Sequence, residues 1–190
     1  MVDNSNISSL EYRLEVDFVK DIMKHLANKS SEFDAAVVVY EHQASVELKF
    51  TRTFKLDRFI SAMDKLASLH KFVPSLPRID NALQVTLDSA FNRNEERNVP
   101  KIIVLLSQGA PSFVMEQFPL RNVSRSLKNK GVRVLVVGVG GDINQELHNI
   151  TEGLNDMMIL VNNNFSSLLK YKDILVEKIC LAAGKFKTSI

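Results

Sequence analysis

The sequence predicts an α/β protein with a doubly wound, mostly parallel sheet, one antiparallel edge strand and helices on both faces. Three observations predict this class. Short β-branched segments alternate with amphipathic helical segments along the chain. One further strand-like segment alternates apolar and polar residues instead. The 190 residues suit one domain of this kind better than two, and 45% of them are hydrophobic, which is enough for a sizeable core.

Four segments of five or six residues are predicted to be buried parallel strands because they are rich in Val, Ile and Leu. They are Ala35–Tyr40, Ile102–Leu106, Val132–Val137 and Met157–Val161. The alternating segment is Val46–Phe50, and its pattern is typical of a half-exposed strand. We therefore expect Val46–Phe50 at an antiparallel edge of the sheet.

Six amphipathic segments are predicted to be helices, because apolar residues recur in them three or four positions apart. In the first, Leu10, Leu14, Phe18, Ile22 and Leu26 follow one another every four residues, and Tyr12, Val16 and Val19 widen the same apolar stripe. The other five are marked by Phe59 to Leu69, Ala82 to Phe91, Leu120 to Leu127, Leu147 to Ile150 and Leu168 to Leu181. Helices of this kind between parallel strands cover both faces of a Rossmann-like sheet.

The first strand of such a sheet is the least clear element. It should be a buried strand in the middle of the sheet, yet only Met1 and Val2 precede the polar residue Asp3. We expect its neighbours to be Ala35–Tyr40 and Ile102–Leu106. We therefore interpret residues 1–190 as a single domain that lacks most of its first central strand and is a fragment of a larger protein.

Composition and motifs argue against several functions. A net charge of +2 without a long basic run gives no sign of a nucleic-acid partner. No apolar stretch approaches the roughly 20 residues of a membrane span, and no signal peptide follows Met1. The turn Gly138–Asp142 lacks dinucleotide-binding spacing, Ser107 lacks the context of a nucleophile, and the four histidines share no metal-ligand spacing. We expect no enzyme and no cofactor.

Modification sites and the single cysteine are weaker signals. Five sequons match the N-glycosylation pattern, beginning at Asn6, Asn28, Asn122, Asn149 and Asn164, against roughly two expected by chance. This excess favours an extracellular protein, although coincidence in a chain rich in Asn and Ser is the alternative. Asn28, Asn122 and Asn149 lie near helix ends or on polar helix faces, and we expect them to be the exposed acceptors. Cys180 has no partner for an internal disulfide.

Five blocks of the sequence, in order, resemble the von Willebrand factor A family, especially its members in collagens and other matrix proteins. The blocks are Val2–Ser5 with the helix after it, Ala36–Leu48, Ile79–Leu83, Val99–Gly109 and Gly131–Gly140 with the helix that ends the chain. The resemblance covers almost the whole chain. It implies the family's fold and a metal-ion-dependent adhesion site, in which three loops hold Mg²⁺ or Mn²⁺ with oxygen ligands.

The family's metal ligands are only partly present in this sequence. Asp3 and Ser5 match the first two ligands, but the third falls on Ile7, the threonine position on Pro77 and the aspartate position on Gln108. Two of these substitutes have no side-chain oxygen and one is neutral, so the resemblance implies weak Mg²⁺ binding at most. Arg78 follows Pro77, and its guanidinium could take the place of the cation beside Asp3, the alternative being an ordinary solvated side chain.

The function expected from these observations is non-enzymatic protein binding. We interpret the chain as an adhesion module of a secreted, matrix or collagen-like protein. Its remnant site is formed by Asp3, Ser5, Arg78 and Gln108, and its ligand is collagen or another matrix protein. The alternative is an intracellular domain of the same family that scaffolds a multiprotein complex. Glycan occupancy would distinguish the two.

Overall fold

The computed structural model describes residues 1–184 except 6, 31, 52, 73, 75–76, 92–98, 109–116, 141–144, 152–156 and 162–163, and it also leaves out the side chains of 117–119, 145–146 and 149. The elements occur in the predicted order. They are β1 (Val2–Asp3), α1 (Ser9–Lys29), β2 (Val37–Tyr40), β3 (Ala44–Leu48), α2 (Leu56–Leu69), α3 (Ile79–Ala90), β4 (Lys101–Ser107), α4 (Gln117–Asn129), β5 (Val132–Val139), α5 (Gln145–Ile150), β6 (Met158–Val161), the 3₁₀ helix η3 (Phe165–Tyr171) and α6 (Lys172–Ala182).

The strands form two three-stranded parts that meet at β1. In one part β2 pairs in parallel with β1 and antiparallel with β3, and in the other β4, β5 and β6 are all parallel. Two hydrogen bonds join the parts: the amino group of Met1 donates to the Val104 carbonyl at 2.6 Å, and the Leu106 amide donates to the Met1 carbonyl at 3.1 Å. β1 therefore lies between β2 and β4, as predicted, and the antiparallel edge strand is confirmed, although it begins at Ala44.

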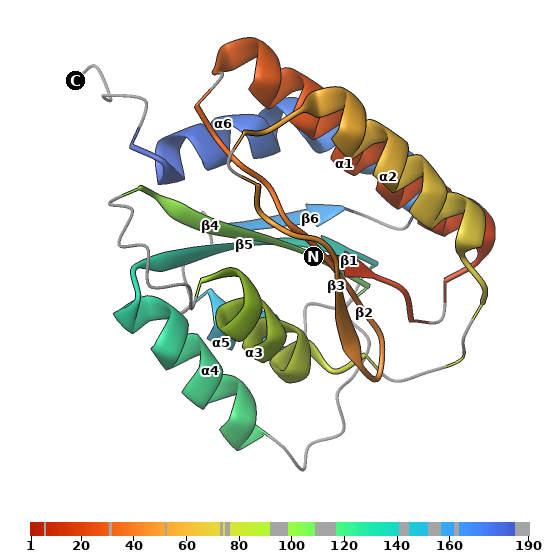
Figure 1. Ribbon diagram of the computed structural model, residues 1–190. Helices are drawn as coiled ribbons and strands as arrows, with labels where there is room; N and C mark the ends of the chain where they lie inside the picture. The colour runs from red at the N-terminus through yellow and green to blue at the C-terminus, as the bar shows by residue number, and fades with distance from the viewer. Residues whose placement is uncertain are drawn as a thin grey trace.

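The helices cover the two faces of the sheet. Figure 1 shows α1, α2 and α6 on one face and α3, α4 and α5 on the other. Each face has its own hydrophobic core, and successive strand residues alternate between them: Leu106 belongs to the core under α1, whereas Leu105 belongs to the core under α3 and α4. The predicted doubly wound class is confirmed.

Two helices differ from the prediction. Leu10 is 69% exposed, and the buried face of α1 is formed by Tyr12, Glu15, Val16, Phe18, Ile22 and Met23. The reason is geometric: an α-helix has 3.6 residues per turn, so a strict four-residue repeat drifts by about 40° at each step and leaves the core face. The predicted last helix is divided into η3 and α6, and its residues Leu169, Ile174 and Leu181 are exposed.

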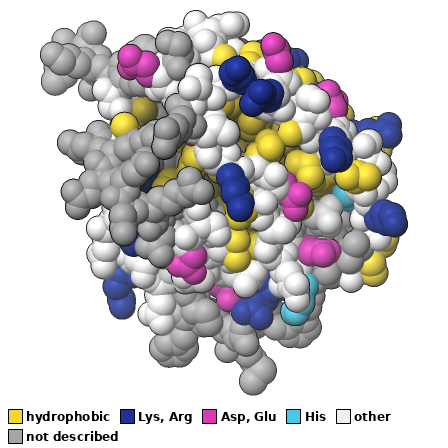
Figure 2. Space-filling model, in the orientation of Figure 1, with side chains coloured by type: hydrophobic (Ala, Val, Ile, Leu, Met, Phe, Trp, Pro, Cys, Tyr) yellow, Lys and Arg dark blue, Asp and Glu magenta, His cyan; other side chains and the backbone are white. Residues whose placement is uncertain are grey.

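The surface of the domain is mixed in character. On the face seen in Figure 2, basic and acidic side chains are interspersed around patches of hydrophobic atoms. Within the described part of the chain, no helix is both long and apolar enough to cross a membrane.

Candidate functional site

The candidate site lies at the carboxyl end of β1, where the chain leaves the sheet and enters α1. The helix begins immediately after Ser8, which caps it. The Ser8 hydroxyl accepts from the Glu11 amide at 3.3 Å, and the Glu11 carboxylate accepts from the Ser8 amide at 2.8 Å, forming a capping box. This cap fixes the start of α1 and so limits the loop between β1 and α1 to residues 4–8.

Asp3 is the centre of a buried hydrogen-bonded group. Its side chain is buried with 1% exposure, and Oδ1 accepts from the amide and the hydroxyl of Ser5 at 2.9 and 2.5 Å. Oδ2 accepts from the backbone amide of Gln108 at 3.4 Å. The neighbouring Tyr40 hydroxyl donates its one proton to the Leu106 carbonyl at 2.7 Å. Both carboxylate oxygens of Asp3 are therefore engaged by the protein itself.

A second carboxyl group, that of Glu15, lies beside Asp3 on the α1 side of the sheet. Glu15 is 1% exposed, and its Oε1 accepts from the Asp3 amide at 3.3 Å. Its Oε2 is buried without a hydrogen-bond partner among the described residues. Burial raises the pKa of Glu15 well above its usual value, and the charge of Asp3 raises it further.

Burial also raises the pKa of Asp3, to about 6, against the opposing effect of the hydrogen bonds from Ser5 and Gln108. The two carboxyl groups compete for ionisation because like charges disfavour each other. Asp3 accepts several hydrogen bonds that stabilise its charged form, whereas Glu15 accepts one long one. We therefore assign the shared proton to Glu15 and the negative charge to Asp3.

The structure brings together three of the four predicted remnant-site residues. Asp3, Ser5 and Gln108 contact one another, but Gln108 takes part through its backbone amide. Arg78 is held differently: its Nε and Nη2 donate to the two carboxylate oxygens of Asp80 at 2.9 and 2.7 Å. The suggested replacement of the cation by the Arg78 guanidinium is therefore wrong, because this fork pairs with the first turn of α3.

The two positions without side-chain oxygens are both turned inward. Ile7 is 0% exposed and belongs to the core under α1, and Pro77 is buried just before α3. Asp3 and Ser5 are also buried to 1% exposure. Within the described residues no group of three or more His, Cys, Asp or Glu side chains is arranged to hold a metal ion. The donor set and the occupied oxygens of Asp3 do not fit the six-oxygen shell that Mg²⁺ requires.

Sequence reasoning missed Glu15 and Tyr40. Glu15 offered a signal, since it is an acidic residue on the apolar stripe of α1, between Tyr12 and Val16. Tyr40 ends a buried strand and gave no such signal.

Of the predicted glycosylation acceptors, Asn28 and Asn122 are exposed, whereas the side chain of Asn149 lies outside the described residues. Cys180 is a buried free thiol.

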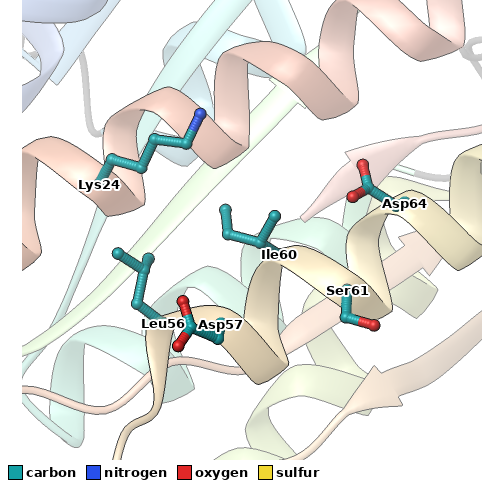
Figure 3. Close-up of a pocket in the computed structure, with 6 residues that line it drawn as sticks. All are labelled: Lys24, Leu56, Asp57, Ile60, Ser61 and Asp64. Carbon is teal, nitrogen blue, oxygen red and sulfur yellow. The ribbon is translucent and has the colours of Figure 1, made fainter.

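A groove of about 540 Å³ lies between α1 and α2, away from the carboxyl end of β1. Figure 3 shows Lys24 on one wall and the α2 side chains Leu56, Asp57, Ile60, Ser61 and Asp64 on the other. Asp64 is already paired with Lys20 at 2.6 Å. The groove is open to solvent, unlike the enclosed pockets that hold small molecules.

Comparison with known proteins places this geometry in a family. The model of the von Willebrand factor type A domain matches residues 1–173. The mouse collagen alpha-5(VI) chain is 22% identical over 186 residues, covering 94% of this chain and 7% of the relative. Mouse matrilin-2 is 24% identical over 187 residues, covering 95% of this chain and 18% of the relative. The chain thus spans less than a fifth of the length of either relative.

Solved structures agree on the fold. Proximal thread matrix protein 1 from the mussel byssus superimposes with a TM-score of 0.74 at 19% identity, over 94% of this chain and 46% of that one. Another structure of the same mussel protein, with a zinc-occupied MIDAS motif, gives a TM-score of 0.76 at 16% identity over the same shares. At these identities the similarity extends to the fold alone.

Proposed function

Because this chain belongs to the von Willebrand factor type A domain family, we propose that it is a non-enzymatic protein-binding module of a secreted matrix protein and that it binds without a divalent cation. The names of two relatives, a collagen VI chain and matrilin-2, support the matrix assignment. The proposed ligand is collagen or another matrix protein. The absence of a catalytic arrangement in the sequence motifs supports a binding role.

One observation carries the proposal of metal independence: the protein's own donors occupy the carboxylate of Asp3. A cation site must leave ligand oxygens free to face the ion, and one coordination position open for the partner. Here Oδ1 of Asp3 accepts twice from Ser5, and Oδ2 accepts from Gln108. Because Ile7 and Pro77 supply no side-chain oxygen, nothing in the described site compensates for that loss.

The rim of this site, and not its centre, is the proposed contact surface. Asp3 and Ser5 are buried and cannot touch a partner. The Arg78 side chain is 40% exposed and Gln108 is half-buried, so both can reach a protein ligand. The Arg78 guanidinium is already oriented by its two hydrogen bonds to Asp80, so its side chain loses little conformational freedom when it binds a partner.

Surface plasmon resonance on a panel of immobilised purified collagens would test the proposal. We expect binding of the 190-residue chain to be equal in millimolar Mg²⁺ and in excess EDTA. Arg78→Ala and Gln108→Ala should weaken it, and Arg125→Ala, an exposed change on α4, should not. Loss of binding in EDTA would contradict metal independence, and no binding to any matrix protein would contradict the function.

A further inference from the structure

Among the residues whose side chains the structure describes, three sequon asparagines lie at the surface of the folded domain. Asn28, Asn122 and Asn164 are all exposed, and each is followed by a non-proline residue and then by serine. We propose that these three asparagines carry N-linked glycans. This inference rests on the proposed extracellular function, since the transferring enzyme acts on chains that enter the secretory pathway.

Asn28 and Asn122 lie on opposite faces of the sheet. Asn28 is in the last turn of α1, beside the end of the helix at Ser30, and Asn122 is on the outer side of α4. In Figure 1 these helices cover the two faces. A bulky, hydrated glycan at either position extends into solvent without displacing a core side chain.

Asn164 combines exposure with a structural role that a glycan preserves. Its Oδ1 caps η3 by accepting from the amide and hydroxyl of Ser167 at 3.2 and 3.1 Å, and from the Ser166 hydroxyl at 2.7 Å. All these contacts use the carbonyl oxygen. Glycosylation substitutes Nδ2 and leaves Oδ1 an amide oxygen, so the cap and the glycan are compatible at the same residue.

The asparagines of the remaining two sequons, Asn6 and Asn149, have side chains that lie outside the part of the chain that the structure describes. We therefore assign glycans to Asn28, Asn122 and Asn164 only.

The transfer needs one co-reactant, an oligosaccharide linked through pyrophosphate to a lipid. The Nδ2 of asparagine loses a proton and forms a bond to the anomeric carbon of the first N-acetylglucosamine. The bond from that carbon to the lipid pyrophosphate breaks, and the pyrophosphate leaves with the electron pair. No oxidant or reductant takes part, and the asparagine carbonyl is unchanged.

The test is expression of the 190-residue chain behind a cleavable signal peptide in mammalian cells. Mobility before and after peptide N-glycosidase treatment, and mass spectrometry of the resulting Asn-to-Asp conversions, report occupancy in both the secreted and the intracellular pools. The variants are Asn28→Gln, Asn122→Gln and Ser166→Ala. Ser166→Ala removes the third sequon but keeps the cap from Asn164 to Ser167, so it separates glycan loss from cap loss.

We expect the wild type to lose three glycans on treatment, each single variant to lose two, and the triple variant to run unshifted. An unshifted wild type in both pools, or a triple variant that still shifts, would overturn the assignment. Collagen binding measured on the same material keeps the two proposals apart. Binding by an unglycosylated wild type would refute only the glycans, and a glycosylated protein that binds no matrix protein would refute only the function.

Discussion

Replacing Glu15 by glutamine should stabilise the domain at neutral pH. Glu15 is buried with 1% exposure, and its Oε2 has no hydrogen-bond partner among the described residues. Burial raises the pKa of this carboxyl, so the native state keeps a proton that the unfolded chain releases. Glutamine has nearly the same shape as the protonated acid and has no proton to lose, so Glu15→Gln removes this cost.

The size of the effect has an upper limit set by the unfolded state. At about pH 7.5 the solution lies about 3 units above the ordinary glutamate pKa of 4.5, so keeping the proton costs the native state at most about 4 kcal/mol. Relative to high pH, where both states are ionised, a carboxyl group whose pKa is raised on folding stabilises the native state. This stabilisation is complete below the unfolded pKa and is lost as the pH rises through the folded pKa. The contribution of Glu15 to the free energy of unfolding should therefore fall by up to about 1.4 kcal/mol per pH unit while Glu15 keeps its proton.

Urea denaturation followed by circular dichroism between about pH 6.5 and 8 measures this slope. Asp3, whose pKa rises from 3.8 to about 6, contributes about 3 kcal/mol, but it does so mostly below this window. Burial lowers the pKa of the Met1 amino group from 8.0 to about 6, so this group makes stability rise with pH inside the window and opposes the slope from Glu15. The contribution of Glu15 is therefore the difference between the slopes of the wild type and the Glu15→Gln variant. Glu15→Gln should raise the free energy of unfolding and flatten the slope, whereas Glu177→Gln, an exposed change on α6, should alter neither. A less stable Glu15→Gln variant, or an unchanged slope, would refute the assignment of the proton to Glu15.

Three further changes test neighbouring contacts. Tyr40→Phe removes the donor to the Leu106 carbonyl and should lower the free energy of unfolding by about 1–3 kcal/mol in urea titrations; no change would mean that water replaces the hydroxyl. Arg78→Ala breaks a part-exposed fork to Asp80 and should cost no more than about 1 kcal/mol, without altering the pH slope. Adding five residues rich in Val and Ile before Met1 should lengthen β1 between β2 and β4. The melting temperature should rise by about 2–4 °C for each kcal/mol added to the free energy of unfolding. An unchanged melting temperature would contradict this prediction.

The strands were predicted well because each is a short apolar run with little ambiguity. The seven-residue β4 and the eight-residue β5 include every residue of the predicted segments. The edge strand was predicted in type but two residues too late, because the pairing of Ala44 and Ser45 with Tyr40 and Val39 is a backbone contact that the side-chain pattern does not record. In α1 the prediction followed an apolar repeat of four residues, whereas the helix has 3.6 residues per turn. The first residue of that repeat, Leu10, therefore lies off the buried face.

The candidate site was predicted only in part, because its essential contacts join distant parts of the chain. Asp3 and Ser5 were identified by their positions in the sequence. The carboxylate of Asp3, however, accepts from the amide of Gln108, which is 105 residues away. The carboxyl group of Glu15 that accepts from the Asp3 amide belongs to a different element, α1. Backbone donors such as the Gln108 amide have no sequence signature at all. The prediction that the Arg78 guanidinium lies beside Asp3 was wrong for a local reason. Asp80, two residues further along the chain, accepts two hydrogen bonds from the guanidinium.

The closed state of Asp3 also explains why restoring the family's metal ligands one at a time should fail. Ile7 is 0% exposed in the core under α1, so Ile7→Ser would remove a packed side chain at a cost of about 2–5 kcal/mol and bury a hydroxyl besides. Any cation would then compete with the Ser5 and Gln108 donors for the oxygens of Asp3. Because the hydrophobic core and the hydrogen bonds favour the same closed arrangement, this end of the sheet acts as part of the structure, which is why we propose that the residues around it recognise the partner.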